Sequence, residues 1–174
     1  MVADLTYTAS GVNLDQYADR LGNLGPALNV IGAYAERRVK ESIIKGQKLN
    51  GQALAPLSPN TVAEKKLRGK ARGILRRDGG LLASIAYQRT SATEVQVGTN
   101  LEYAPWVILG TDPYTIRSKS ADKPLRFYTA EGWRQASAVD HPGLPERNVF
   151  EGFEAALGPF VEATLASYLS GGKP

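Results

Sequence analysis

The sequence predicts an α+β fold with amphipathic helices at the N-terminal end, a central antiparallel β-sheet with hairpins, and helices at the C-terminal end. Three observations support this order. Apolar residues recur at helical spacing before residue 46, short strand-like segments follow between residues 85 and 138, and a helical pattern returns after residue 149. The chain has 174 residues, of which 43% are hydrophobic, so it is long enough for one domain with a real core.

The longest predicted helix lies in the first quarter of the chain. Its apolar residues recur at steps of three and four positions, as one buried helix face requires: Leu28, Ile31, Ala35, Val39 and Ile43. Pro26 suits an early helical position, and Gly46 suits the position after the last residue. We therefore expect a helix that continues to about Lys45.

Shorter elements are predicted on either side of this helix. Residues 15–21 are expected to form a short helix that stops at Gly22, and residues 1–13 before it an N-terminal arm or edge strand. Ser58 followed by Pro59 is typical of an N-cap and a first-turn proline, so a further short helix should reach about Leu67.

Hairpins are predicted in the middle of the chain. The strand-like segments are 85–89, 93–97, 114–117, 125–129 and 133–138. The first two are separated by a gap of hairpin size, and Glu131-Gly132 is a turn between the last two. The apolar run 103–109 predicts one or two helical turns closed by Gly110. These segments together predict the central antiparallel sheet.

The C-terminal third is predicted to be helical. Val149, Phe150, Phe153 and Leu157 share one apolar face, and Gly158-Pro159 is expected to interrupt the helix before it resumes. Residues 14–170 are therefore expected to form a single α+β domain with an exposed basic loop near residues 65–78. Residues 171–174 are expected to be a disordered tail.

Catalytic and metal-binding constellations are poorly represented. The chain has one histidine, His141, and no cysteine, which removes Ser-His and Cys-His catalysis and the usual zinc sites. His141 stands in the sequence DHPG, where a turn histidine that bonds the backbone is expected. Glu151 and Glu154 are expected on one solvated helix face rather than across a cleft. We therefore expect no enzymatic activity, no metal and no cofactor.

Positive charge is concentrated in one stretch. The net charge is +4, and twelve lysines and arginines lie between residues 37 and 77. The part around Gly69 and Gly73 has little to bury, so it is expected to be exposed and mobile. The residues expected to contact DNA or an acidic partner are Lys65, Lys66, Arg68, Lys70, Arg72, Arg76 and Arg77. A solvated charged surface without a partner explains the same composition.

Five segments, in order, resemble the phage virion-morphogenesis and tail-completion proteins. They are LSPNTVAEKK at 57–66, GILRRDGGLLASI at 73–85, VQVGTNLEYAPWVILGT at 95–111, TIRSKSADKPLRFYTAEGWRQASAVDHPG at 115–143 and LPERNVFEGF at 144–153. The fourth is similar to a hairpin of that family that ends in HPG. Departures lie at Gly80, where the family usually has a basic residue, at Trp106-Val107-Ile108, and at Asn148-Val149, where it usually has proline-phenylalanine.

The resemblance implies a structural protein of the head–tail junction, of the tail-completion or tail-terminator type. It also implies a homo-oligomeric ring, with six subunits as the expected number, that joins the tail to the DNA-filled head around a DNA channel. Other phage neck and tail proteins are the further expected partners, and packaged DNA could be contacted in the channel. The family has no catalytic residues that match positions of this sequence.

Contacts between subunits are expected from aromatic side chains of the middle segments, namely Tyr103, Trp106, Phe127 and Trp133. No apolar run approaches the roughly 18 residues of a membrane helix, and the N-terminus lacks the pattern of a signal peptide. The expected location is the virion, after synthesis in the host cytoplasm. Two alternatives remain: a sequence-independent DNA-binding protein that acts outside the particle, and a cryptic hydrolase of the particle.

Overall fold

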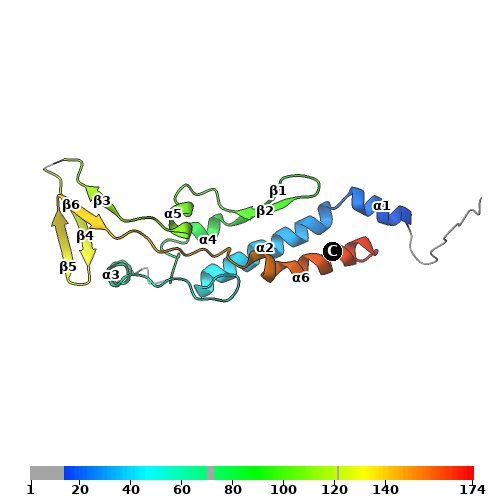
Figure 1. Cartoon of the computed structure of the whole chain (residues 1–174), viewed down its shortest axis with the longest axis horizontal. Helices are drawn as coiled ribbons and strands as arrows, with labels where there is room; N and C mark the ends of the chain where they lie inside the picture. Colours follow the sequence, from blue (N-terminus) through cyan, green and yellow to red (C-terminus); the bar gives the residue numbers. More distant parts are fainter. Residues whose placement is uncertain (1–13, 70–72, 121) are drawn as a thin grey trace, which may run out of the picture.

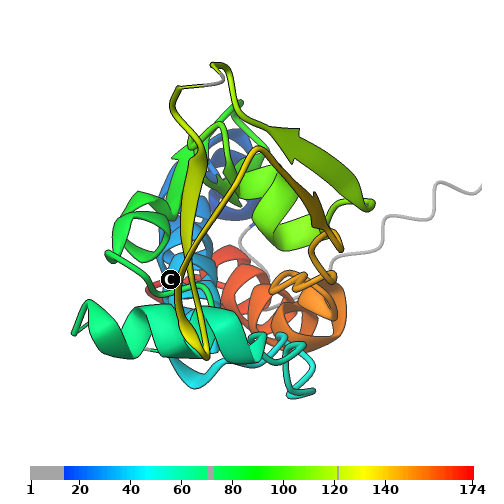
Figure 2. The ribbon, with the colours of Figure 1, turned by 90° about the vertical axis from the view of Figure 1, so that its left-hand side faces the viewer.

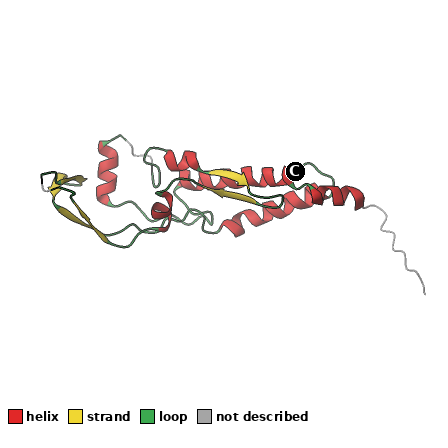
Figure 3. Cartoon of the chain, turned by 90° about the horizontal axis from the view of Figure 1, so that it is seen from above, coloured by secondary structure: helices red, strands yellow, loops and turns green. Residues whose placement is uncertain are grey.

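The computed structural model describes residues 14–69, 73–120 and 122–174. Helices and small antiparallel ladders follow one another along the chain, so the predicted α+β class is confirmed. The molecule is elongated: two long helices and one hairpin form a body, and the remaining strands occupy the opposite end (Figure 1). The view from above shows one helix, α3, lying crosswise between the body and those strands (Figure 3). The expected N-terminal arm, residues 1–13, lies outside the described residues.

The helix expected from the apolar spacing is α2, Gly25–Lys45. It buries Leu28, Ile31, Ala35, Val39 and Ile43, which are the five residues that define its predicted face. Helix α6, Phe153–Leu169, runs back along it in the opposite direction, and the short α1, Leu14–Gly22, lies near the end of α6 (Figure 1). Because α2 contributes to the largest core cluster along three turns, it is the centre of the body.

The first predicted hairpin packs on α2. Its strands are β1, Ala86–Arg89, and β2, Val95–Gly98, with Tyr87 opposite Val97. The Tyr87 backbone N–H donates to Oε2 of Glu36 on α2 at 3.1 Å. A hydrogen bond from Lys40 and this backbone N–H lower the pKa of Glu36, against the opposing effect of burial. A packed apolar face and a charged acceptor therefore both hold the hairpin on the helix.

Three short helices connect the body with the far end. Helix α3, Pro59–Leu67, begins as predicted, since the Ser58 hydroxyl accepts a hydrogen bond from the Thr61 N–H at 3.2 Å. Helices α4, Gly80–Ser84, and α5, Ala104–Leu109, form a second apolar cluster through Leu81, Ala104 and Ile108. Leu75 and Phe150 pack against both clusters and so join α5 to the body.

The remaining strands form one long bent hairpin, here called the β arm and comprising the described residues 111–120 and 122–144. Its first ladder pairs β3, Tyr114–Arg117, with β6, Ala138–His141. Its second ladder pairs β4, Leu125–Thr129, with β5, Gly132–Ala136. Between the two ladders the Ser118 N–H donates to the Ser137 carbonyl at 2.8 Å, so pairing continues across the bend. Seen along the long axis, the arm rises beside α5 and comes down toward α3 (Figure 2).

Two details of the prediction were wrong. The strands form three separate two-stranded ladders rather than one central sheet, and the expected strand 133–138 is divided into β5 and β6. The C-terminal third is one helix, because Gly158-Pro159 does not interrupt α6. Leu157 and Thr164 on either side of this step are buried, so packing keeps both halves of α6 on the body despite the proline.

Pro159 should therefore reduce the stability of the chain. Its ring is exposed, and a proline in a helix interior lacks the N–H that would pair with the carbonyl four residues earlier. We expect Pro159→Ala to raise the free energy of unfolding by about 2 kcal/mol, measured by urea denaturation. Ala163→Gly, at an exposed position of the same helix, is the control and should lower it by about 1 kcal/mol. A loss of stability in Pro159→Ala would contradict this account of α6.

Candidate functional site

The predicted basic residues do not form one uniformly exposed loop. Lys66, Arg68 and Arg77 are exposed and Arg76 is half-buried, whereas Lys70 and Arg72 lie outside the described residues. The expectation of exposure was wrong for Lys65, which is only 8% exposed. Its ammonium donates hydrogen bonds to the Gly73 carbonyl and, at 3.3 Å, to the Arg76 carbonyl. Lys65 thus holds the segment after α3 against that helix.

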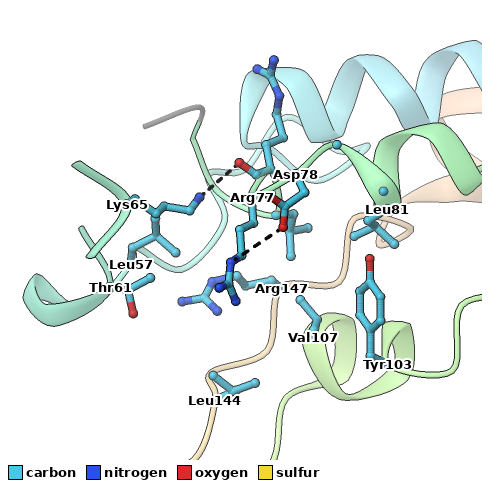
Figure 4. A pocket seen from close by; sticks show the side chains of 14 residues that line it. Leu57, Thr61, Lys65, Arg77, Asp78, Leu81, Tyr103, Val107, Leu144 and Arg147 are labelled. Atoms are coloured by element: carbon cyan, nitrogen blue, oxygen red, sulfur yellow. Dashed lines mark hydrogen bonds and ion pairs between the residues drawn. The ribbon is translucent and has the colours of Figure 1, made fainter. Parts of the chain in front are cut away.

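Lys65 lies at the edge of a pocket with a volume of about 540 Å³. The walls come from α3, the segment 75–81, α5 and the segment 144–147. Figure 4 shows Arg77 and Arg147 in the middle of the pocket, with Leu57 and Thr61 on one side and Val107 and Tyr103 on the other. The pocket combines an apolar wall with several cations, and among its lining residues only Asp78 has a carboxylate.

Arg147 is the functional candidate that the sequence did not reveal. Only 6% exposed, it donates from Nε to the Ala55 carbonyl at 2.9 Å and from Nη2 to the Pro56 carbonyl at 2.8 Å. Its backbone N–H donates to the Ile108 carbonyl at 2.8 Å. These bonds connect three distant parts of the chain. The local sequence gives one signal, a single arginine two residues before the buried Val149.

The cations influence one another electrostatically. Burial lowers the pKa of Lys65, and the positive charges of Arg147, Arg76 and Arg77 lower it further. Burial also lowers the pKa of Arg147, whose guanidinium nevertheless stays charged at neutral pH. Within the described part of the chain, neither Lys65 nor Arg147 forms an ion pair. The pocket is therefore a region of positive potential.

Backbone strain occurs at the same place. Leu75, which lines the pocket, has a φ of +58°. This is the left-handed backbone conformation, which residues other than glycine rarely adopt. Its side chain packs against both apolar clusters. The packing of Leu75 therefore maintains a strained turn between α3 and α4.

The base of the β arm depends on two glycines. Thr111 and Leu144 exchange backbone hydrogen bonds of 3.0 and 3.1 Å where the two legs leave the body. A Cβ on Gly110 would lie 2.5 Å from the Leu144 carbonyl oxygen, and one on Gly143 would lie 2.2 Å from that of Thr111. Both glycines also have positive φ. The close approach explains why glycine occupies these two positions.

The remaining residues of the HPG segment complete the turn. The Gly143 N–H donates to Nδ1 of His141 at 3.0 Å, so the expectation of a turn histidine is confirmed. The ring of His141 also stacks on Tyr114 of the opposite strand, with centroids 4.9 Å apart. At the other end of the arm, the Ala130 N–H donates to Oδ1 of Asn60 on α3 at 3.0 Å. The arm is thus attached to the body at its base and at its tip.

The aromatic residues expected at a subunit interface differ in exposure. Tyr103, Trp106 and Trp133 are exposed, the tryptophans by 58% and 50%, and Phe127 is half-buried. Trp133 packs edge-on against Tyr128 and under the guanidinium of Arg126, which lies 4.5 Å from its ring centroid. Trp106 shares the outer face of α5 with the exposed Leu109. Apolar area is thus left uncovered on both the arm and α5.

The acidic pair considered as a catalytic candidate does not share a helix. Glu151 precedes α6 and forms an ion pair with Lys48, whereas Glu154 stands in the first turn of α6. In the described residues, no group of three or more His, Cys, Asp or Glu side chains has an arrangement that could hold a metal ion. No described helix has the length and apolar character to span a membrane.

The model of the phage virion morphogenesis family matches residues 9–153. The chain belongs to this family. The matched range includes the pocket, α5 and the whole β arm, and it ends at the first residue of α6. Comparison with curated proteins and with solved structures gave no match. A role connected with the phage virion follows from membership of the family.

Arg147 should be important for stability. Arg147→Met keeps much of the side-chain volume but removes two hydrogen bonds to backbone carbonyls in a buried setting. Because the Ala55 and Pro56 carbonyls then lose their donor, we expect the free energy of unfolding, measured by urea denaturation, to fall by about 1–3 kcal/mol. Arg134→Met, whose side chain is 56% exposed, should change it by less than about 0.5 kcal/mol. If Arg147→Met and Arg134→Met lower the free energy of unfolding by similar amounts, the hydrogen bonds of Arg147 contribute little to stability.

Proposed function

We propose that this protein is a structural component of the head–tail junction of a tailed phage, of the tail-completion or tail-terminator type. In this proposal it forms a homo-oligomeric ring, with six subunits as the expected number, that joins the tail to the DNA-filled head without enzymatic activity. The observation that carries the proposal is the exposure of Trp106 and Trp133 on α5 and the β arm, inside the region matched by the virion family. Large exposed aromatic side chains are typical of residues buried on association.

Two separate exposed surfaces on one subunit suit the proposed ring. Trp106 lies on α5 near the base of the arm, and Trp133 lies on β5, in the part of the arm beyond the bend. A head-to-tail contact uses two different surfaces of each subunit, and it closes into a ring when the rotation between neighbours is suitable. We propose that the arm of one subunit contacts its neighbour near α5.

Trp133→Ala should weaken assembly more than folding. Half of this side chain is exposed, so its removal should cost the monomer only about 1 kcal/mol in the free energy of unfolding. In the ring the side chain would be covered, so the midpoint concentration of assembly, measured by light scattering, should rise by at least about tenfold.

Tyr17→Ala is the control for this variant. Tyr17 is also exposed, but it stands on α1 at the end of the molecule opposite the arm (Figure 1). We expect Tyr17→Ala to leave the midpoint concentration of assembly unchanged. If Trp133→Ala lowers folding stability as strongly as assembly, Trp133 belongs to the core of the monomer. The proposal of a ring would be overturned if the isolated wild-type chain stays monomeric at all concentrations and is also present as a single copy in the particle.

The exposed basic residues favour one second candidate, sequence-independent binding of DNA outside the particle. Lys66, Arg68 and Arg77 are accessible at the surface near the pocket. Such a protein binds duplex DNA in solution, with an affinity that falls steeply as salt increases. A ring subunit that faces packaged DNA would use the same residues. In that case, their loss would reduce the yield of particles, whereas in the second candidate it would reduce binding of duplex DNA in solution.

A triple substitution distinguishes these possibilities. Changing Arg72, Arg76 and Arg77 together to Gln should leave folding nearly intact and reduce the yield of DNA-filled, tailed particles, counted by electron microscopy. The control changes Arg37, Lys45 and Arg89 to Gln; these residues are exposed on α2 and β1, outside the β arm, and carry the same total charge. If the first variant gives a normal yield of DNA-filled, tailed particles over a range of salt concentrations, the basic residues are only a solvated surface. Reduced duplex binding with normal yield would favour the second candidate.

A further inference from the structure

We propose that the pocket between α3, α4 and α5 binds an acidic peptide segment of a partner protein. A carboxylate of the peptide would face Arg77 and Arg147, and a neighbouring aliphatic or aromatic side chain would lie on the wall formed by Leu57, Val107 and Leu144. The proposal deepens the proposed function, since the partner would be another protein of the particle. Binding to the isolated chain does not require the ring.

The first argument is the unbalanced charge of the pocket. Four cations line it, namely Lys65, Arg76, Arg77 and Arg147, against the single carboxylate of Asp78. Lys65 and Arg147 are almost completely buried, and their hydrogen bonds go to neutral backbone carbonyls. Buried charges in proteins are usually paired, because an unpaired charge loses its hydration without recovering it. An anion in the pocket would supply the missing partner.

Arg77 is the cation best placed to meet such an anion. It is the most accessible of the set, and its contacts with Glu64 and Asp78 are long, at 3.7 and 3.8 Å. A guanidinium can bind a carboxylate with two parallel hydrogen bonds at shorter distances. A peptide carboxylate could therefore replace these loose pairs with a closer one, supported by the potential of the buried cations behind it.

The second argument is the apolar wall, which favours a peptide over nucleic acid. Leu57, Leu75, Leu81, Val107 and Leu144 line the same pocket as the cations. A duplex presents a continuous hydrophilic phosphate backbone, which gains nothing from a recessed apolar surface. A peptide can place a carboxylate and an apolar side chain within two residues of each other, so it matches both features at once.

The tip of the β arm of a second copy is a less suitable occupant than a partner protein. Glu131 at this tip already pairs with Arg134, so its carboxylate would have to leave that pair before it could enter the pocket. A partner with an unpaired acidic segment has no such cost.

An array of eight-residue fluorescent peptides tests the proposal with the full-length chain. The peptides carry zero to four glutamates around a central leucine, phenylalanine or serine, and a parallel set carries glutamine in place of glutamate. Fluorescence anisotropy should show affinity increasing with glutamate number and decreasing by about tenfold when the central apolar residue becomes serine. Equal binding of the glutamate and glutamine sets, or no binding by any member, would overturn the proposal.

Two variants locate the binding in this pocket. Arg77→Glu should weaken binding of the acidic peptides by at least about tenfold. Arg134→Glu is a matched control, because its side chain is 56% exposed against 57% for Arg77, it is also ion-paired, and it produces the same change in net charge. Val107→Ser should weaken only those peptides that contain leucine or phenylalanine. Circular dichroism melting establishes that each variant is folded.

The remaining outcomes identify other occupants. If Arg134→Glu weakens binding as much as Arg77→Glu, the peptides respond only to overall charge and the proposal is wrong. If a mixed-sequence DNA duplex binds more tightly than every peptide and loses this binding in Arg77→Glu, the pocket belongs to a nucleic-acid surface. If Arg77→Glu changes the mass of the oligomer and no peptide binds, the occupant is a second copy. Ring formation by the wild type is measured separately, so failure of the ring would not be mistaken for failure of the pocket.

Discussion

Burial of one face of α2 is the constraint on which the rest of the structure depends. The hairpin β1–β2 and helix α6 both pack against this helix, and Ala35, Val39 and Ile43 are central to the largest core cluster. Neither neighbour could persist alone, since a two-stranded hairpin is only marginally stable in water and the apolar helix α6 needs a surface to cover. The segments that connect these elements, including α4 and the residues before α6, are positioned by the same cluster through Ile85 and Val149.

The far end of the molecule is built on a different principle. Beyond the small cluster of Leu81, Ala104 and Ile108, it is held mainly by backbone pairing and by side chains that bond to carbonyl groups. The two legs of the arm approach each other so closely at Gly110 and Gly143 that no side chain fits there. Because little apolar area is buried in this region, its aromatic side chains remain available for other contacts.

The sequence predicted those features that depend on local chemistry. The spacing of five apolar residues identified the buried face of α2, Ser58-Pro59 identified the start of α3, and the DHPG sequence identified a backbone-bonded histidine. Its failures concern long-range contacts. Pro159 was expected to break α6 because the packing around it was unknown, and Lys65 was expected to be exposed because lysine usually is. Arg147 was missed because its carbonyl partners at Ala55 and Pro56 lie about ninety positions earlier in the chain.

Helix α3 connects the two halves of the molecule, and its attachments are polar. Lys65 is the only residue of this helix that is buried, so apolar packing does not fix the position of the helix. Asn60, near its start, accepts a hydrogen bond from the tip of the arm, and Lys65, more than one turn later, binds the carbonyls that frame the pocket. The pocket and the arm tip therefore share one short rigid element. The hydrogen bond at Asn60 and the contact of α3 with β4 join the helix to the arm, so we expect a contact that moves α3 at the pocket to act on the arm as well.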